Sequence, residues 1–408
     1  MMTLLVATLL HPDPHGTSYA IEAARLTNAT VRAFYDAKAR IWKPPVASAE
    51  SVGNQGYTFW PSLLAWQAVI EGAKVDPKTW KGKIAPFYDA LEQYYDASGH
   101  AYCAWKMFPG NDDKFYDDNT WAAVACMEAY ETTGEARYRT RAIAIFDGFV
   151  KGGWDAKDGG LRWGTKAGIE DRQDHTVSAT AAGALAALLI AKTHDAKANR
   201  LWAKRALDWI HVKLSQPNGL IQDGIKQDGR IMTTVWTYNT GVPIRAAIEY
   251  AEQTGDKGYR TWAVKMGDAA LDRSLSPLYD GAVADLSKRY WYDGVYFVQY
   301  LVDGLRTLSL ATGEKKYLVE SRREADYVRT YLKDRDGLYW RSMRLWQINA
   351  DRTAAFQNLT GTTVVPAPDA SERSQEPSAM AKPVEERPMV KTVLANAGAA
   401  RMFWLLAH

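Results

Sequence analysis

The stretch Glu128-Ala-Tyr-Glu-Thr-Thr-Gly134 is followed at once by Glu135-Ala-Arg-Tyr138. It predicts a helix that ends at a glycine and a second helix that begins with an acidic residue. Glycine takes the left-handed backbone conformation at no steric cost, and an acidic side chain suits a helix N-terminus. Two further strong copies and two weaker ones lie at residues 249–255, 309–313, 73–77 and 192–195. The chain is therefore built from helical hairpins.

The spacing of these five junctions indicates how many hairpins there are. They fall near positions 75, 134, 195, 255 and 313, a period of about sixty residues that fits two helices and two connections. Segments near 17–40 and 389–407 supply two more helices that would pair and close a ring. We predict an all-α fold, an (α/α)6 barrel or six-hairpin toroid, with residues 1–408 as one catalytic domain. The competing interpretation is an open helical solenoid.

The apolar pattern separates two kinds of helix. Trp202, Ala206, Trp209 and Leu214 follow the spacing of three to four residues that is typical of an amphipathic helix. Residues 179–189 are apolar nearly all round, as expected of an inner helix packed on every side. Residues 352–391 interrupt the period with five prolines, and we interpret them as a long surface excursion.

Composition narrows the class of protein. The net charge is +3 and the basic residues form no stripe, so nucleic acid is not an expected partner. The apolar run 179–191 is too short to span a membrane. Cys103 and Cys126 allow at most one disulfide. The 16 Trp and 22 Tyr indicate a carbohydrate cleft, or else a large core filled by wide side chains.

One acidic loop carries the strongest chemical signal. It reads Asn111-Asp-Asp-Lys-Phe-Tyr-Asp-Asp-Asn-Thr-Trp121 and leads directly into a helix. Glycoside hydrolysis needs one carboxylate and one carboxylic acid, and Asp117 and Asp118 at the helix start would titrate as a coupled pair. The alternatives are that they only cap the helix, or that the neighbouring pair Asp112-Asp113 carries the chemistry.

Other polar residues give weaker signals. His175 precedes the apolar helix and would reach the cleft or serve as a cap. No metal-ligand spacing, nucleophile elbow or phosphate loop is present, so we expect neither a metal nor a cofactor. Five aspartates in glycine-bearing loops are candidates for contacts with sugar hydroxyls, or else turn formers: Asp155, Asp158, Asp174, Asp223 and Asp228.

Several motifs together resemble one family. The segment from Tyr116-Asp-Asp-Asn-Thr-Trp to Tyr-Glu-Thr-Thr-Gly134 resembles glycoside hydrolase family 76, the α-1,6-mannanases. Gly159-Gly-Leu-Arg-Trp163, Thr233-Thr-Val-Trp-Thr-Tyr-Asn-Thr-Gly241 and Asp293-Gly-Val-Tyr-Phe-Val-Gln-Tyr-Leu301 also resemble it. The resemblance covers about residues 55–345 and the last helix. Arg162 departs from the Gly-Gly-Gly-Ile-Trp pattern that is common in the family.

The resemblance implies a function and a set of site residues. It implies an (α/α)6 barrel that cleaves α-1,6-mannosidic linkages in mannan-type glycans, endo-acting and with retention. Asp117 would be the nucleophile and Asp118 the general acid/base. The residues expected to bind the sugar are Trp121, Trp163, Tyr238, Asn239 and Asn119. We expect a monomer acting on α-mannan.

Two other readings stay open. One is a different sugar-active enzyme on the same barrel, an epimerase or an unsaturated glucuronyl hydrolase, although epimerases of this fold use paired histidines that the sequence does not show. The other is a non-catalytic glycan-binding protein. The resemblance implies that the protein is secreted or periplasmic. Met1–Leu10 lacks a clear secretion signal, which leaves a cytoplasmic location as the alternative.

Overall fold

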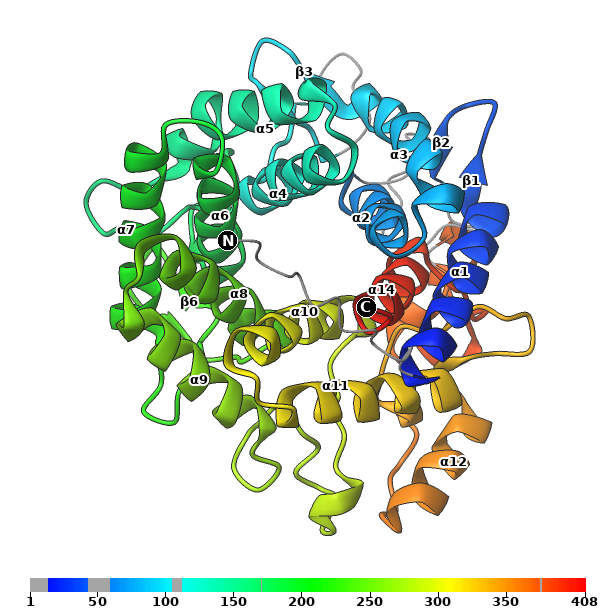
Figure 1. Ribbon diagram of the computed structural model, residues 1–408. Helices are drawn as coiled ribbons and strands as arrows, with labels where there is room; N and C mark the ends of the chain where they lie inside the picture. Colours follow the sequence, from blue (N-terminus) through cyan, green and yellow to red (C-terminus); the bar gives the residue numbers. More distant parts are fainter. Residues whose placement is uncertain (1–13, 43–58, 105–111, 170, 375) are drawn as a thin grey trace, which may run out of the picture.

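The computed structural model describes residues 14–42, 59–104, 112–169, 171–374 and 376–408; the N-terminal segment weighed above as a secretion signal lies outside them. In the described chain, six helices form an inner ring and six form an outer ring around them (Figure 1). The inner helices are α2 (Phe59–Val75), α4 (Tyr116–Thr133), α6 (Val177–Ala191), α8 (Thr237–Thr254), α10 (Val295–Thr312) and α14 (Val393–Leu405). The outer helices are α1 (Pro14–Phe34), α3 (Pro77–Leu91), α5 (Ala136–Gly148), α7 (Ala196–Leu214), α9 (Lys257–Leu271) and α11 (Lys316–Tyr327). The predicted (α/α)6 barrel is confirmed.

The hairpin junctions lie where the sequence period predicts them. Gly134, Gly255 and Gly313 end α4, α8 and α10 with φ of 79°, 77° and 78°, the left-handed conformation that favours glycine. At the two weaker copies, the side chains of Asp76 and Asp195 accept hydrogen bonds from backbone N–H groups at the starts of α3 and α7. Each junction turns the chain from an inner helix to the outer helix beside it.

The two ends of the chain close the ring. Helix α14 packs against α2 and α10 in the inner ring and against α1 outside it. The indole nitrogen of Trp404 donates a hydrogen bond to Oγ1 of Thr27, 377 residues away. The predicted first helix is too long, because α1 ends at Phe34. The residues that follow form a hairpin of β1 (Tyr35–Asp36) and β2 (Ile41–Trp42). Two backbone N–H groups of its turn donate hydrogen bonds to the Asp36 side chain.

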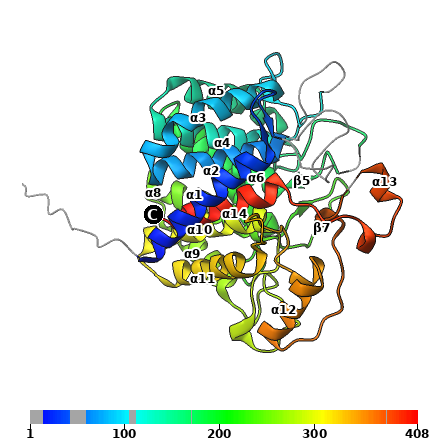
Figure 2. The ribbon, with the colours of Figure 1, turned by 90° about the vertical axis from the view of Figure 1, so that its right-hand side faces the viewer.

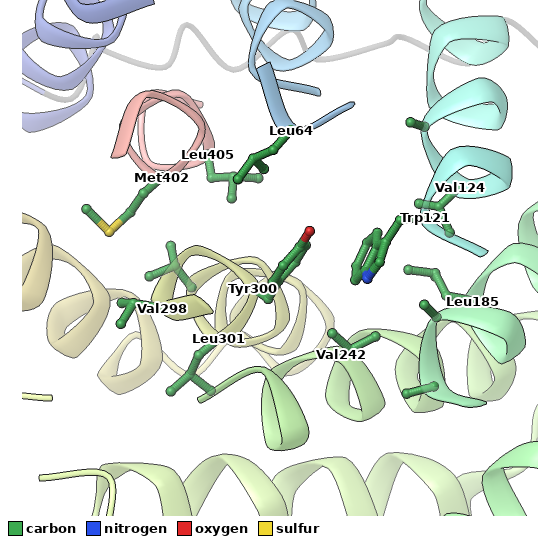
Figure 3. Packing of buried hydrophobic residues seen from close by; sticks show 14 of the residues in the cluster. Leu64, Trp121, Val124, Leu185, Val242, Val298, Tyr300, Leu301, Met402 and Leu405 are labelled. Carbon is green, nitrogen blue, oxygen red and sulfur yellow. The ribbon is translucent and has the colours of Figure 1, made fainter. Parts of the chain in front are cut away.

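Side chains fill the barrel axis. Trp121 of α4 and Tyr300 of α10 stack with ring centroids 4.2 Å apart (Figure 3). Leu64 of α2, Val242 of α8 and Leu185 of α6 surround them in the same view. Helix α6 is buried along almost its whole length, as its all-apolar sequence predicts. The inner ring therefore encloses a packed core, with Trp121 and Tyr300 at its centre.

The connections on one face of the barrel are longer and carry the small strands (Figure 2). β3 (Tyr95–Asp96) pairs with β4 (Ala101–Tyr102), and β5 (His175–Thr176), β6 (Gly224–Ile225) and β7 (Ile231–Met232) form one antiparallel sheet in that order. Short helical turns are η2 (Glu92–Tyr94), η3 (Val150–Gly153), η4 (Leu286–Lys288), the π-helical η5 (Val328–Leu332), η6 (Leu345–Gln347), η7 (Ala370–Glu372) and η8 (Val384–Glu386). This face receives the N-terminal ends of the inner helices.

The described part of the proline-rich stretch carries two helices, α12 (Ala350–Thr360) and α13 (Pro377–Met380). Helix α13 lies on the side of the barrel that carries β5 and β7 (Figure 2). The buried Glu372 of this stretch accepts hydrogen bonds of 2.8 Å from the backbone N–H groups of Arg341 and Ser342. Elsewhere, Cys103 and Cys126 are buried and no disulfide joins them. Within the described residues, no helix has both the length and the apolar character to cross a membrane.

Candidate active site

A pocket of about 470 Å³ opens where the N-terminal ends of α2, α4, α6, α8 and α10 converge. That size suits a small-ligand site. The helix N-termini carry partial positive charge and favour carboxylates there. The lining residues are Trp60, Ala104, Phe115, Asp117, Asp118, Trp121, Trp163, Asp171, Asp174, Thr176, Ser178, Asp223, Lys226, Met232, Tyr238, Val242, Phe297 and Tyr300. The pocket is thus an acidic chamber with aromatic walls.

Asp117 lies in the first turn of α4 and is held by three donors. Its Oδ2 accepts hydrogen bonds from Nε1 of Trp163 at 2.9 Å and from Oγ of Ser178 at 3.4 Å. Its Oδ1 accepts from the backbone N–H of Asp118 at 2.9 Å. Burial raises the pKa of Asp117 to about 6, and these three hydrogen bonds oppose that rise by favouring the ionised form. The carboxylate has a fixed orientation, as a nucleophile requires.

Asp118 faces the same pocket in a different electrostatic setting. Burial raises its pKa well above the usual range, and the negative charges of Asp117 and Asp113 raise it further, while Arg172 opposes them. Since two adjacent buried carboxyls do not both ionise easily, the pair holds one proton over a wide pH range. The environment places that proton on Asp118. One ionised and one protonated carboxyl is the combination that general acid catalysis of glycoside cleavage needs.

Trp163 lies in the connection between α5 and α6, and contacts with the start of α4 set its position. The backbone N–H of Tyr116 donates to the carbonyl of Trp163 at 2.8 Å, and Phe115 pairs with Gly164 in an isolated antiparallel bridge. A Cβ at Gly164 would lie 2.5 Å from Cδ of Arg172, so a larger residue there would displace the Arg172 side chain. The indole of Trp163 lies beside the start of α4. Trp163 was predicted as a sugar-binding residue, and the structure places it in the pocket wall.

Two of the residues predicted to bind sugar do not line the pocket. The buried side chain of Asn119 is used by the backbone, since its Oδ1 accepts from the N–H of Tyr102 and its Nδ2 donates to the carbonyls of Tyr102 and Phe115. It fastens α4 to the β4 strand. The buried Asn239, with its amide oriented to satisfy both ends, donates to Oδ1 of Asp223 at 3.2 Å and accepts from the N–H of Trp236.

Tyr238 and Trp121 do lie in the pocket. The hydroxyl of Tyr238 donates a hydrogen bond of 2.7 Å to Oδ1 of Asp223. Burial raises the pKa of Asp223, while the hydrogen bond from Tyr238 opposes that rise. Asp223 thus adds a further carboxyl to the chamber, fixed by two residues of the Trp-Thr-Tyr-Asn motif. Trp121, stacked on Tyr300, forms part of the floor.

The other aspartates considered from sequence divide into two groups. Asp174 and Asp223 line the pocket, and Nζ of Lys226 lies 2.9 Å from Oδ2 of Asp174. Asp155, Asp158 and Asp228 are not among the lining residues. Asp155 instead pairs with Arg162, and Arg162, the residue that departs from the family pattern, is not among the lining residues either. The buried His175 packs edge-on against Trp209 and lies outside the lining as well.

The sequence interpretation missed part of the chamber. Trp60, Ser178 and Phe297 lie in the first turns of α2, α6 and α10 and line the pocket. Their common signal is position, because the barrel brings the first turn of every inner helix to one face. In the described residues, no group of three His, Cys, Asp or Glu side chains is placed to hold a metal ion.

An (α/α)6 barrel with two adjacent carboxyls in its pocket lining suits glycoside hydrolysis, which needs one carboxylate and one carboxylic acid. Residues 19–358 match the sequence profile of Glycosyl hydrolase family 76. This chain belongs to that family.

The similarity to other proteins extends over almost the whole chain. The "Meiotically up-regulated gene 191 protein" of Schizosaccharomyces pombe is 28% identical over 414 residues, which cover 96% of this chain and 92% of that protein. A family 76 α-mannanase of Bacteroides thetaiotaomicron matches with a TM-score of 0.73 and 16% identity, covering 95% of each chain. The α-1,6-mannanase of a Salegentibacter species matches with a TM-score of 0.69 and 17% identity, covering 95% of this chain and 99% of that one. It was solved as an inactive variant, with two neighbouring aspartates replaced by asparagine, in complex with α-1,6-mannotriose.

Proposed function

We propose that this glycoside hydrolase cleaves α-1,6-mannosidic linkages within mannan-type glycans, with retention of anomeric configuration. One observation carries the proposal: Asp117 and Asp118 share a buried chamber in which one carboxyl is held by three donors and the other is surrounded by negative charge. That asymmetry assigns the two roles. Asp117 is the nucleophile and Asp118 is the general acid/base.

The first half of the reaction breaks the glycosidic bond. A carboxylate oxygen of Asp117 attacks the anomeric carbon while Asp118 gives its proton to the glycosidic oxygen. The bond between the anomeric carbon and that oxygen breaks, and the leaving sugar departs as an alcohol. The donor sugar stays attached to Asp117 as an ester, and Asp118 is now ionised.

The second half releases the product. Asp118, now a base, takes a proton from a water molecule whose oxygen attacks the anomeric carbon. The ester bond to Asp117 breaks and its carboxylate is regenerated, while Asp118 again holds a proton. Two inversions at the same carbon give net retention.

The rest of the chamber suits a sugar chain. Asp223, fixed by Tyr238 and Asn239, presents a carboxyl that accepts hydrogen bonds from ring hydroxyls. Trp163, Phe297 and the other aromatic lining residues offer ring faces to the apolar sides of the sugars. The mannotriose complex of the Salegentibacter α-1,6-mannanase supports α-1,6-mannan as the substrate class.

A sugar epimerase from a ruminal bacterium shares the fold, with a TM-score of 0.65 and 12% identity over 96% of this chain. The composition of the pocket favours hydrolysis over epimerisation. Its described lining contains five aspartates and no histidine, and His175 lies outside it. A proton-shuttling histidine pair therefore has no counterpart among these lining residues.

The test is hydrolysis of linear α-1,6-mannan by the parent protein and by the Asp117→Asn and Asp118→Asn variants. The parent should release oligosaccharides of several lengths, and the initial products should show the α-anomer by proton NMR. Each variant should lose at least about a hundredfold in rate. Asp112→Asn is the matched control, because Asp112 is exposed and forms an ion pair with Lys166. This variant should keep parental activity. Release of the β-anomer first would contradict retention, and no release from any α-mannan would contradict the substrate class.

A substrate with an activated aryl leaving group separates the two roles. It needs little protonation of the departing oxygen, so it should restore much of the first step in Asp118→Asn but not in Asp117→Asn. Equal rescue of both variants would contradict the assignment. Binding of mannan without hydrolysis by the parent would instead favour a glycan-binding protein.

A further inference from the structure

The second aspartate pair in the acidic loop, Asp112-Asp113, is divided by the fold. Asp112 is exposed and pairs with Lys166, whereas Asp113 is buried and pairs with Arg172. Nη2 of Arg172 lies 3.2 Å from Oδ2 of Asp113, with side-chain exposures of 15% and 9%. No donor among the described residues reaches Oδ1 of Asp113. A buried ion pair thus joins the segment just before α4 to the loop before β5.

Arg172 also supports the residues that hold Asp117. Its guanidinium carbon lies 4.1 Å from the ring centroid of Phe115 and 5.0 Å from that of Trp163. Its backbone carbonyl accepts a hydrogen bond of 2.7 Å from the N–H of Gly164. Trp163 in turn donates to Asp117. Arg172 therefore contacts Asp113 through its charge and Trp163 through its planar face.

We propose that Asp113 and Arg172 form a positioning pair for the two carboxyls at the start of α4: Arg172 holds Trp163 against Asp117, and the opposed charges of the pair balance the charge on Asp118. This inference rests on the proposed function in that Asp118 is taken as the general acid. Neither residue touches the reacting atoms. They act through the field at Asp118 and through the packing of Trp163.

The charges that face Asp118 come from three elements. Asp117 lies beside it on α4, Asp113 comes from the segment before α4, and Arg172 comes from the loop before β5. The remaining titratable groups of the chamber with described side chains are Asp171, Asp174, Asp223, Lys226, Tyr238 and Tyr300. Lys226 is already paired with Asp171 and Asp174, which reduces its field at Asp118. Asp113 and Arg172 are thus the opposing charges near Asp118 other than its catalytic partner.

Two single variants should move the pH profile in opposite directions. Removing the positive charge by Arg172→Met raises the pKa of Asp118, so the alkaline limb of kcat/KM should move to higher pH. Removing the negative charge by Asp113→Asn lowers that pKa, and the alkaline limb should move to lower pH. We expect each shift to be about half a pH unit or more, and the double variant to lie between them.

Further variants separate charge from packing. Arg172→Lys keeps the charge but loses the planar stacking, so its alkaline limb should stay near the parental position while kcat falls through a loosened Trp163. The matched control is the ion pair Arg137–Asp89, also 3.2 Å long, which joins α5 to α3 on the surface. Arg137→Met and Asp89→Asn should leave the profile unchanged. Thermal unfolding of every variant identifies any that fail to fold.

A readout that needs no substrate keeps this inference separate from the proposed function. In protein labelled with ¹³C at aspartate carboxyls, the signal lost in Asp118→Asn identifies Asp118, and its titration can be followed in each variant. Opposite shifts of its apparent pKa in Asp113→Asn and Arg172→Met would support the pair even if α-1,6-mannan were not cleaved. Shifts in the same direction, or none in either folded variant, would overturn the proposal.

Discussion

Nε1 of Trp163 donates a hydrogen bond of 2.9 Å to Oδ2 of Asp117, across 46 positions of sequence. The contact joins the acidic motif at the start of α4 to the Gly-Gly-Leu-Arg-Trp motif of the next hairpin. It orients the carboxylate and stabilises its ionised form, so a residue in the pocket wall also tunes the carboxyl that we propose as the nucleophile.

Trp163→Phe tests this contact while keeping an aromatic ring in the wall. Loss of a hydrogen bond to a charged group costs about 1.5–3 kcal/mol, so kcat/KM should fall roughly 10- to 100-fold. The pKa of Asp117 should rise, because a contact that favours its ionised form is gone. The acid limb of the pH–rate profile should therefore move to higher pH. A parental profile with normal rates would show that the hydrogen bond contributes nothing.

Asp118→Asn should stabilise the fold at neutral pH. In the folded protein the pKa of Asp118 lies well above its value in the unfolded chain, so between those two values the folded state binds the extra proton. Stability then falls as pH rises through that window. Asparagine has no proton to lose, so its advantage should appear above about pH 4 and grow with pH.

Thermal unfolding at a series of pH values measures this effect. Near pH 7 the midpoint of Asp118→Asn should exceed that of the parent by roughly 1–3 °C, and the difference should vanish below about pH 4. Asp112→Asn, at an exposed position in the segment before α4, should give no gain. An unfolding midpoint of Asp118→Asn below that of the parent at every pH would contradict the raised pKa of Asp118.

Arg245 lies within the inner ring, away from the pocket lining. It bridges Glu128 at 2.6 Å and Asp303 at 2.7 Å, and Asp303 also accepts from Arg401. Arg245→Met removes the cation that bridges Glu128 and Asp303 and leaves Asp303 with Arg401, so it should cost about 3–5 kcal/mol of unfolding free energy. Denaturant unfolding would measure that loss, with the exposed Arg137→Met as control. An unchanged midpoint would show that the network adapts without the charge.

Glu372 fastens the proline-rich excursion to the barrel by accepting two backbone hydrogen bonds. Burial raises its pKa to about 7. Glu372→Ala leaves the two N–H groups of Arg341 and Ser342 without an acceptor, so residues 350–392 should be cleaved faster in limited proteolysis. Glu385→Ala, exposed on the same excursion, is the control and should be cut at the parental rate.

The fold was predictable because its signals are local. Each of these signals can be recognised within about ten residues of sequence. They are a glycine that ends a helix, an aspartate that caps the next helix and an inner helix that is apolar all round, as at Gly134, Asp195 and α6. The end of α1 was not predictable, because the Asp36 turn that stops the helix depends on a hairpin formed afterwards. The order within 350–392 was also hidden, since it depends on the buried contact of Glu372 with distant backbone.

The site was predictable only in part. Asp117, Asp118, Trp163 and Tyr238 reach the pocket, and their motifs marked them. Asn119 was chosen by its place beside the aspartates, but a helix turns by about 100° per residue and directs it into the packed side of α4. Partnerships between loops, such as those of Trp163 and Arg172, follow from the tertiary fold and leave no local pattern.

The most direct test of the account is to identify the carboxyl that becomes covalently attached to the sugar. A mannose-configured epoxide inactivator, which reacts with the nucleophile of retaining enzymes, would be incubated with the parent protein, and the labelled peptide would be fragmented by mass spectrometry. The account predicts a single adduct on Asp117, absent in Asp117→Asn and formed more slowly in Asp118→Asn, which lacks the acid that protonates the epoxide oxygen. An adduct on Asp118 or Asp223, or hydrolysis of α-1,6-mannan with inversion and no adduct at all, would contradict it.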